Sequence, residues 1–160
     1  MQDASVSHAT ASDWEKVYRE ESPKLWRALV LHTGSSEVAS DAVAEAFAQG
    51  IARGAAIKKP GAWVWRAAFM IARGDLAQRQ EALAGHAQSE ISSPERVMDL
   101  VQALGALSPM QRASIILRYF SGYSVAETAA ILGSTRSAVG VHLFRARNKL
   151  RDELEDDDER

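Results

Sequence analysis

The chain has no cysteine among its 160 residues, which excludes disulfide bridges, thiolate metal sites and a cysteine nucleophile. It has no apolar run close to the roughly 20 residues that cross a bilayer. Residues 1–13 have neither the basic start nor the apolar stretch of a signal peptide. We therefore expect a soluble, cytoplasmic protein. No alternating apolar run is long enough for a strand, so the sequence predicts an all-α fold.

Patterns that carry catalysis are also missing. There is no glycine-rich phosphate loop, and the histidines do not have the spacing of metal ligands: His8, His32, His86 and His142. The acidic run 155–159 is typical of a disordered, solvated tail rather than a cation site. We therefore expect no cofactor, no metal site and no enzymatic activity.

Helical periodicity dominates what is present, and 46% of the residues are hydrophobic. Apolar spacing predicts helices over 14–31, 37–53 and 61–79, with Pro23 kinking or dividing the first. A segment rich in Ala, Gly, Ser and Gln follows, and helical patterning then resumes as far as Leu107. The chain is thus expected to form two small helical domains joined by a flexible linker, with these bounds: 14–80, linker 81–96, 97–154, and an acidic tail 155–160.

Residues 107–154 predict a helix-turn-helix. Ser108 caps a helix with Pro109 in its first turn, where the missing N–H has no cost. Ser124 caps a short helix and pairs with Glu127 in a capping box. Gly133 suits the left-handed turn that follows. A last helix begins near Thr135 and runs through 150, as expected for an element that lies in a major groove.

The last helix has two faces. One stripe is apolar and should pack inward: Val139, Leu143, Ala146 and Leu150. Ser137, Val141 and Asn148 face roughly opposite, and three arginines flank them: Arg136, Arg145 and Arg147. Early residues of such a helix would contact base edges, and later arginines would contact phosphates.

Charge is distributed unevenly, although the net charge is only −2. Residues 108–151 carry seven Lys and Arg against the single acid Glu127, whereas residues 152–160 carry seven acids against one Arg. A basic segment followed by an acidic one is expected to bind DNA through the first block. The acidic block could compete with DNA for the basic helix.

Residues 107–154 resemble region 4 of extracytoplasmic-function sigma factors, through LSPMQR, LRYFSGYS, AETAAILG and SAVGVHLFRARNKLR. The resemblance implies a module that binds the upstream (−35) promoter element. The implied DNA-binding residues are Ser124, Thr135, Arg136, Ser137, Val141, Arg145 and Arg147. Gly140 departs from the pattern, because the family often has a basic or polar residue there.

The first half resembles sigma region 2, through SEVASDAVAEAFAQGIARG and KKPGAWVWRAAFMIARGDLAQ. The resemblance implies contact with the downstream (−10) element through Arg53, Lys58, Lys59, Trp63, Arg66 and Arg73. It implies contact with core RNA polymerase through Glu37, Asp41, Glu45 and Phe47. Trp63, Trp65 and Phe69 suit either base stacking or a core, and aromatic residues at helical spacing are more often core.

The resemblance as a whole implies a sigma factor that directs RNA polymerase to promoter DNA and is inhibited by an anti-sigma partner. Met70 and Gly74 stand where the family usually has Asn and Asp, which weakens the expectation of promoter melting. A sigma-like regulator that does not initiate transcription therefore stays open, as does an interaction module without DNA binding. LuxR-type regulators end in a similar module.

Overall fold

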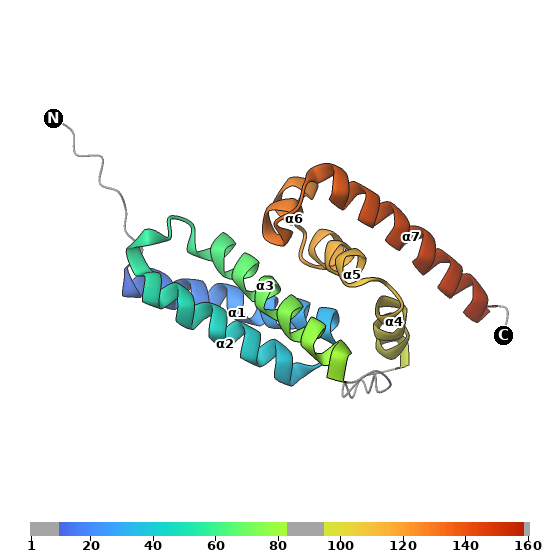
Figure 1. Cartoon of the computed structure of the whole chain (residues 1–160), viewed down its shortest axis with the longest axis horizontal. Helices are drawn as coiled ribbons and strands as arrows, with labels where there is room; N and C mark the ends of the chain where they lie inside the picture. Colours follow the sequence, from blue (N-terminus) through green and yellow to red (C-terminus); the bar gives the residue numbers. More distant parts are fainter. Residues whose placement is uncertain (1–9, 83–94, 159–160) are drawn as a thin grey trace.

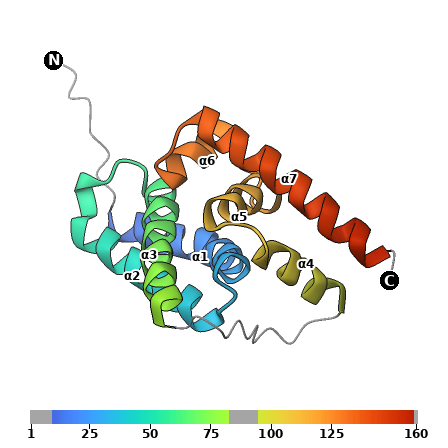
Figure 2. The same cartoon turned by 45° about the vertical axis from the view of Figure 1, so that its right-hand side comes forward.

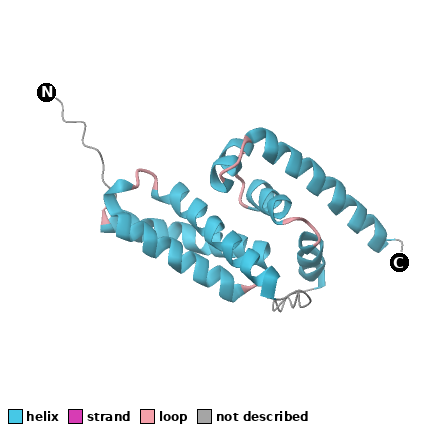
Figure 3. Cartoon of the chain, viewed as in Figure 1, coloured by secondary structure: helices cyan, strands magenta, loops and turns pink. Residues whose placement is uncertain are grey.

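The computed structural model describes residues 10–82 and 95–158, and every regular element in these two ranges is helical (Figure 3). The all-α prediction is confirmed for this part of the chain. Within the same ranges, no helix combines the length and the hydropathy that a membrane span requires.

Three long helices form the first half: α1 (Ala11–Thr33), α2 (Ser36–Arg53) and α3 (Pro60–Ala82), with a short turn η1 (Gly54–Ala56) between the last two. Thr10 and Asp13 form a capping box at the start of α1, and Gly34 ends the helix with φ 71°. The expectation that Pro23 divides this helix is wrong, because α1 continues through it. Burial of Leu25 and Leu29, both fully enclosed, holds the turns after Pro23 in the helix.

The second half contains α4 (Glu95–Gly105), α5 (Pro109–Ile115), a π-helical turn η2 (Ile116–Phe120), α6 (Val125–Leu132) and α7 (Arg136–Asp158). The last helix is longer than predicted. It continues to Asp158, so the expectation of a disordered acidic tail is wrong for residues 155–158. Leu, Glu and Arg are strong helix formers, and basic and acidic residues four apart (149 with 153, 151 with 155) support the extension.

The two halves pack directly against each other (Figures 1 and 2). One hydrophobic cluster runs through both, and it includes Trp65 and Phe69 of α3 together with Leu104 and Leu117 of the second half. Helix α3 contacts α6, and α1 contacts η2. The predicted linker falls mainly on residues 83–94, outside the described residues, so the domain bounds remain a prediction.

Helices α1 and α2 approach closely at Gly50. A Cβ atom at this position would overlap the indole ring of Trp14, which packs edge-on against Phe47 with ring centroids 6.3 Å apart. Gly50 therefore sets the distance between the two helices, and the glycine is required by packing rather than by backbone conformation.

Candidate nucleic-acid interface

The helix-turn-helix is built by local signals that the structure confirms. The Ser124 hydroxyl accepts a hydrogen bond from the Glu127 amide (3.1 Å), and the Glu127 carboxylate accepts one from the Ser124 amide (3.1 Å). Hydrogen bonds to its carboxylate from the Ser124 amide and from the Ser124 side chain lower the pKa of Glu127. Helix α6 then ends at Gly133, whose φ of 61° is left-handed, and the Ser134 amide donates back to the Ala129 carbonyl (2.9 Å).

Helix α7 begins directly after this turn. Thr135 is its cap, because the Thr135 hydroxyl accepts a hydrogen bond from the Ala138 amide (3.1 Å). The expected inward stripe is confirmed: Val139, Leu143 and Ala146 are buried and Leu150 is partly buried. The orientation of α7 is therefore fixed by burial of this stripe.

The opposite face of α7 is open to solvent. Arg136, Ser137 and Arg145 are exposed, and 47% of Val141 is accessible. Ser124 and Thr135 are exposed too; the Thr135 hydroxyl accepts the capping bond and retains its O–H to donate, whereas the Ser124 hydroxyl is also hydrogen-bonded to the Glu127 side chain. The structure thus brings the seven residues predicted to contact the −35 element onto the two helices of one motif and leaves them accessible.

The six residues predicted to contact the −10 element divide into two groups. Arg53, Lys58 and Lys59 are exposed around η1, and the Arg53 guanidinium lies 5.3 Å from the ring centroid of Trp63. Trp63 is half-buried and packs edge-on against Trp14 (6.4 Å). This group presents positive charge beside an aromatic ring at one end of α3.

The other two basic residues of this set face the helix-turn-helix. Arg73 donates to the Leu132 carbonyl at the end of α6 (3.3 Å). The Arg66 guanidinium approaches Gly133, where it would lie 3.7 Å from an added Cβ. Both side chains remain exposed overall, but they reach the turn that precedes α7.

The residues predicted to bind polymerase differ in how exposed they are. Glu37, Asp41 and Glu45 are exposed on one face of α2, as an acidic stripe requires. Phe47 is only 3% exposed and belongs to the core, so its contact with polymerase stays a prediction. Its ring packs edge-on against Tyr18 (4.9 Å) as well as Trp14, because these α1 residues close over it.

An apolar groove between α1 and α2, of about 670 Å³, lies beside that stripe and was not anticipated. Phe47 contributes to its floor, and its walls carry exposed large side chains: Tyr18, Trp26 and Ile51. The sequence did contain a signal for this groove, because these large apolar residues fall outside the buried face of their helices. Exposed apolar surface of this kind marks interaction sites.

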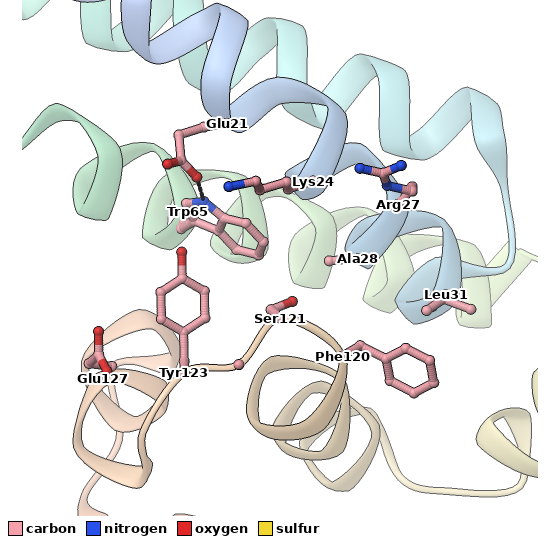
Figure 4. A pocket seen from close by; sticks show the side chains of 11 residues that line it. Glu21, Lys24, Arg27, Ala28, Leu31, Trp65, Phe120, Ser121, Tyr123 and Glu127 are labelled. Atoms are coloured by element: carbon pink, nitrogen blue, oxygen red, sulfur yellow. Dashed lines mark hydrogen bonds between the residues drawn. The ribbon is translucent and has the colours of Figure 1, made fainter.

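An aromatic contact joins the two halves beside a hydrogen bond within the first half (Figure 4). The Trp65 indole donates to the Glu21 carboxylate (2.8 Å), and the Tyr123 ring packs edge-on against Trp65 (5.1 Å). These side chains border a pocket of about 660 Å³ between α1 and the segment that connects η2 to α6. Burial, with the charges of Glu21 and Glu127, raises the pKa of Tyr123 to about 12.

Arg112 makes a second junction. Its guanidinium donates to the carbonyls of Leu104 (2.9 Å), Leu107 (3.1 Å) and, across the junction, His32 (2.6 Å). The His32 ring is fully buried against Phe69, and neither ring nitrogen has a hydrogen-bond partner. Burial, and then the charges of Arg112 and Arg73, lower the pKa of His32 to about 3.

No group of three or more His, Asp or Glu residues within 10–82 and 95–158 is placed to hold a metal ion. The accessible features of this part of the chain are therefore a basic helix-turn-helix, a basic aromatic cluster, and an acidic stripe beside an apolar groove.

Comparison with known proteins finds similarity to RNA polymerase sigma factors. Residues 98–150 match the family described as sigma-70, region 4. The chain is 40% identical over 79 residues to the ECF RNA polymerase sigma factor SigD of Mycobacterium tuberculosis, covering 49% of this chain and 37% of that protein. It is 27% identical over 168 residues to the ECF RNA polymerase sigma factor BldN of Streptomyces coelicolor, covering 92% of this chain and 62% of that protein.

A solved structure shows the same fold: the sigma factor RpoE from Bartonella quintana, crystallised with the anti-sigma factor NepR. The TM-score is 0.75 at 22% identity, over 91% of this chain and 98% of that one. The matches to SigD and BldN span less than two thirds of those proteins. Residues 98–150 are thus similar to region 4 of the sigma-70 family, and the relatives matched are named ECF RNA polymerase sigma factors.

Proposed function

We propose that this protein is a sigma factor that binds core RNA polymerase and directs it to specific promoters. The observation that carries the proposal is the open, basic face of α7. Its recognition residues Arg136, Ser137 and Val141 are exposed, while the stripe beneath them is fixed by burial. The region 4 match over residues 98–150 supports it, as do relatives that are named RNA polymerase sigma factors.

In this proposal the second half contacts the −35 element. Arg136 and Ser137 contact base edges in the major groove, and the Val141 side chain packs on a thymine methyl group. Ser124, Thr135, Arg145 and Arg147 contact phosphates. Phosphate contacts fix the register of the helix on the duplex, and the base contacts supply specificity.

The first half contacts the polymerase through the face of α2. Glu37, Asp41 and Glu45 attract a basic partner surface, and the neighbouring apolar groove buries nonpolar side chains of that partner. Phe47 supports this surface from beneath, since its ring is part of the core. This function places the protein in the cytoplasm, where the polymerase is.

The cluster around η1 is the part of the first half assigned to contact with the −10 element in this arrangement. An unstacked base of a melted strand needs an aromatic surface and positive charge, which Trp63 and Arg53 provide together with Lys58 and Lys59. Arg66 and Arg73 can contribute only after α6 moves away, because Arg73 is hydrogen-bonded to the end of that helix. The proposed function therefore includes separation of the two halves on the polymerase.

We further propose regulation by an inhibitor protein of the anti-sigma class. The related RpoE structure was solved in complex with such a factor. The pocket between α1 and the η2–α6 segment offers a surface at the junction of the two halves. No bond-making chemistry is assigned to the chain, because RNA synthesis is performed by the polymerase.

The test is run-off transcription with purified core polymerase and a pool of promoter fragments from the source genome. We expect specific transcripts only when this protein is added. Asp41→Lys should abolish core binding and transcripts, while Glu20→Lys, an equally exposed charge reversal on α1, should leave both intact. Core binding without transcripts, even on pre-melted templates, would instead favour a regulator that does not initiate transcription.

A further inference from the structure

The π-helical turn η2 places two aromatic residues on the surface, Tyr119 beside α7 and Phe120 beside α1. The turn is widened: the Ser121 amide donates to the Ile116 carbonyl and the Tyr123 amide to the Leu117 carbonyl, both at 3.0 Å. Ile116 and Leu117 are fully buried, whereas Tyr119 remains 53% exposed. π-helical turns inside helices occur frequently at functional sites, because the extra residue redirects neighbouring side chains.

Tyr119 is held by arginines from two different helical elements. Arg147 of α7 donates from Nη1 to the Tyr119 hydroxyl (2.8 Å). Arg118 of η2 has its guanidinium carbon 5.6 Å from the centroid of the Tyr119 ring. The tyrosine hydroxyl accepts one hydrogen bond and still has its own O–H to donate. Three donor groups are thus gathered at one exposed place.

No carboxylate neutralises this cluster. Among the described residues the only ion pair joins Arg19 to Glu15 in α1, so neither Arg118 nor Arg147 lies within 4 Å of a described acid. The single acid of residues 108–151 is Glu127, and it is occupied in the Ser124 capping box. Two guanidinium groups held together by an exposed tyrosine without an acidic partner are suited to binding an anion.

The cluster lies on one edge of the recognition helix. Arg136 and Arg147 are 11 residues apart, which in an α-helix is about 16 Å along the axis and about 20° around it. A helix with its side chains is about 10–12 Å across and the major groove is about 12 Å wide, so each edge of the helix faces a sugar-phosphate backbone. The edge that begins at Arg136 continues to the tyrosine cluster.

We propose that Arg118, Tyr119 and Arg147 bind the phosphodiester backbone of promoter DNA, with Tyr119 as a positioning residue that orients Arg147. This inference rests on the proposed function and extends the DNA interface from the helix-turn-helix onto η2. Backbone contacts do not depend on base sequence, so the site strengthens binding to any duplex and leaves the choice of promoter to the first turns of α7.

The test is titration of the full chain with a fluorescent 20-base-pair duplex of arbitrary sequence, over a series of salt concentrations. Each phosphate contact contributes about −0.9 to the slope of log affinity against log salt. We expect Arg118→Gln and Arg147→Gln each to make the slope shallower by about 0.9. Tyr119→Phe should weaken binding several-fold, and it should have no further effect in the Arg147→Gln background.

The matched control is Lys16→Gln, because it removes one exposed positive charge on α1, distant in sequence from the basic helix. It should leave affinity and slope unchanged, and all variants should keep the thermal midpoint of the parent. If the parent binds with a steep salt slope but the Tyr119 and Arg118 variants match it, the inference is wrong while DNA binding stands. If the parent shows no salt-dependent binding at all, DNA binding in the proposed function fails as well.

Discussion

The two halves carry basic residues for DNA in very different states of access. In the second half Arg136 projects from α7 into solvent, and nothing in the first half covers its recognition face. In the first half Arg73 is hydrogen-bonded to the end of α6, and Arg66 reaches the same turn. The surface proposed for the −35 element is therefore accessible, whereas the far end of the surface proposed for the −10 element is engaged within the molecule.

This difference follows from where each basic residue lies relative to the shared core. Arg136 begins a helix whose buried stripe packs inward, toward α5 and α6, and its own side chain is exposed on the outside of the molecule. Arg66 and Arg73 belong to α3, whose Trp65 and Phe69 bury against the second half. Helix α3 therefore forms part of the contact between the two halves and also part of the proposed DNA surface. The accessibility of Arg66 and Arg73 thus depends on how the two halves are packed.

The strongest test of a shared core is Phe69→Ala. Phe69 is fully buried in α3 and contacts Trp65 and His32 of its neighbours in the cluster. We expect a loss of about 4 kcal/mol in the free energy of unfolding. Calorimetry should show both halves melting in one transition at a lower temperature. A second transition at the parent's midpoint would show that the halves fold independently.

Arg112→Met tests the polar part of the junction. The variant removes the donor to three carbonyls, those of Leu104, Leu107 and His32. Leaving these acceptors without a partner should cost about 3 kcal/mol, measured by urea unfolding. Arg19→Met, which breaks only an exposed ion pair with Glu15, should change stability by less than about 0.5 kcal/mol. Equal effects of the two variants would contradict the junction.

His32→Leu tests the same junction through pH. The pKa of His32 is about 3 in the folded chain, against about 6.5 when unfolded, so only the unfolded chain binds this proton in between. Stability should be unaffected above pH 6.5 and fall as pH decreases toward 3. The difference in the free energy of unfolding between variant and parent should therefore shift by about 2 kcal/mol in favour of the variant when the pH is lowered from 7.5 to 5. Parallel pH profiles would disprove the buried neutral ring.

Local features could be predicted from the sequence, and long-range ones could not. The Ser124 capping box and the Gly133 turn depend on residues within a few positions of each other, so spacing alone identified them. Arg73 and Leu132 are 59 residues apart, and no periodicity of the sequence predicts the hydrogen bond between them. Burial of Phe47 is likewise decided by Trp14, which belongs to another helix.

Gly50→Ala tests packing within the first half. Alanine is the better helix former, but its Cβ would overlap the Trp14 indole, which is buried between α1, α2 and α3. We expect the clash to outweigh the helix propensity, with a net loss of about 1.5 kcal/mol. Thermal unfolding measures the change, and near-ultraviolet circular dichroism of Trp14 should change with it. A stabilised variant would mean that the ring moves aside without cost.

Gly140→Ala is the counterpart in the second half. Gly140 lies within α7, is exposed, and an added Cβ would meet no atom within 4 Å. The substitution should therefore gain about 0.5–1 kcal/mol, because alanine restricts the unfolded chain and no neighbour opposes it. Gly140→Lys should retain most of that gain and also steepen the salt dependence of DNA binding by about 0.9, as one added phosphate contact requires. Gly140 lies about 20° around the helix axis from Arg147, so a lysine that stabilises the helix without changing the salt slope would contradict a backbone contact along the edge that carries Arg136 and Arg147.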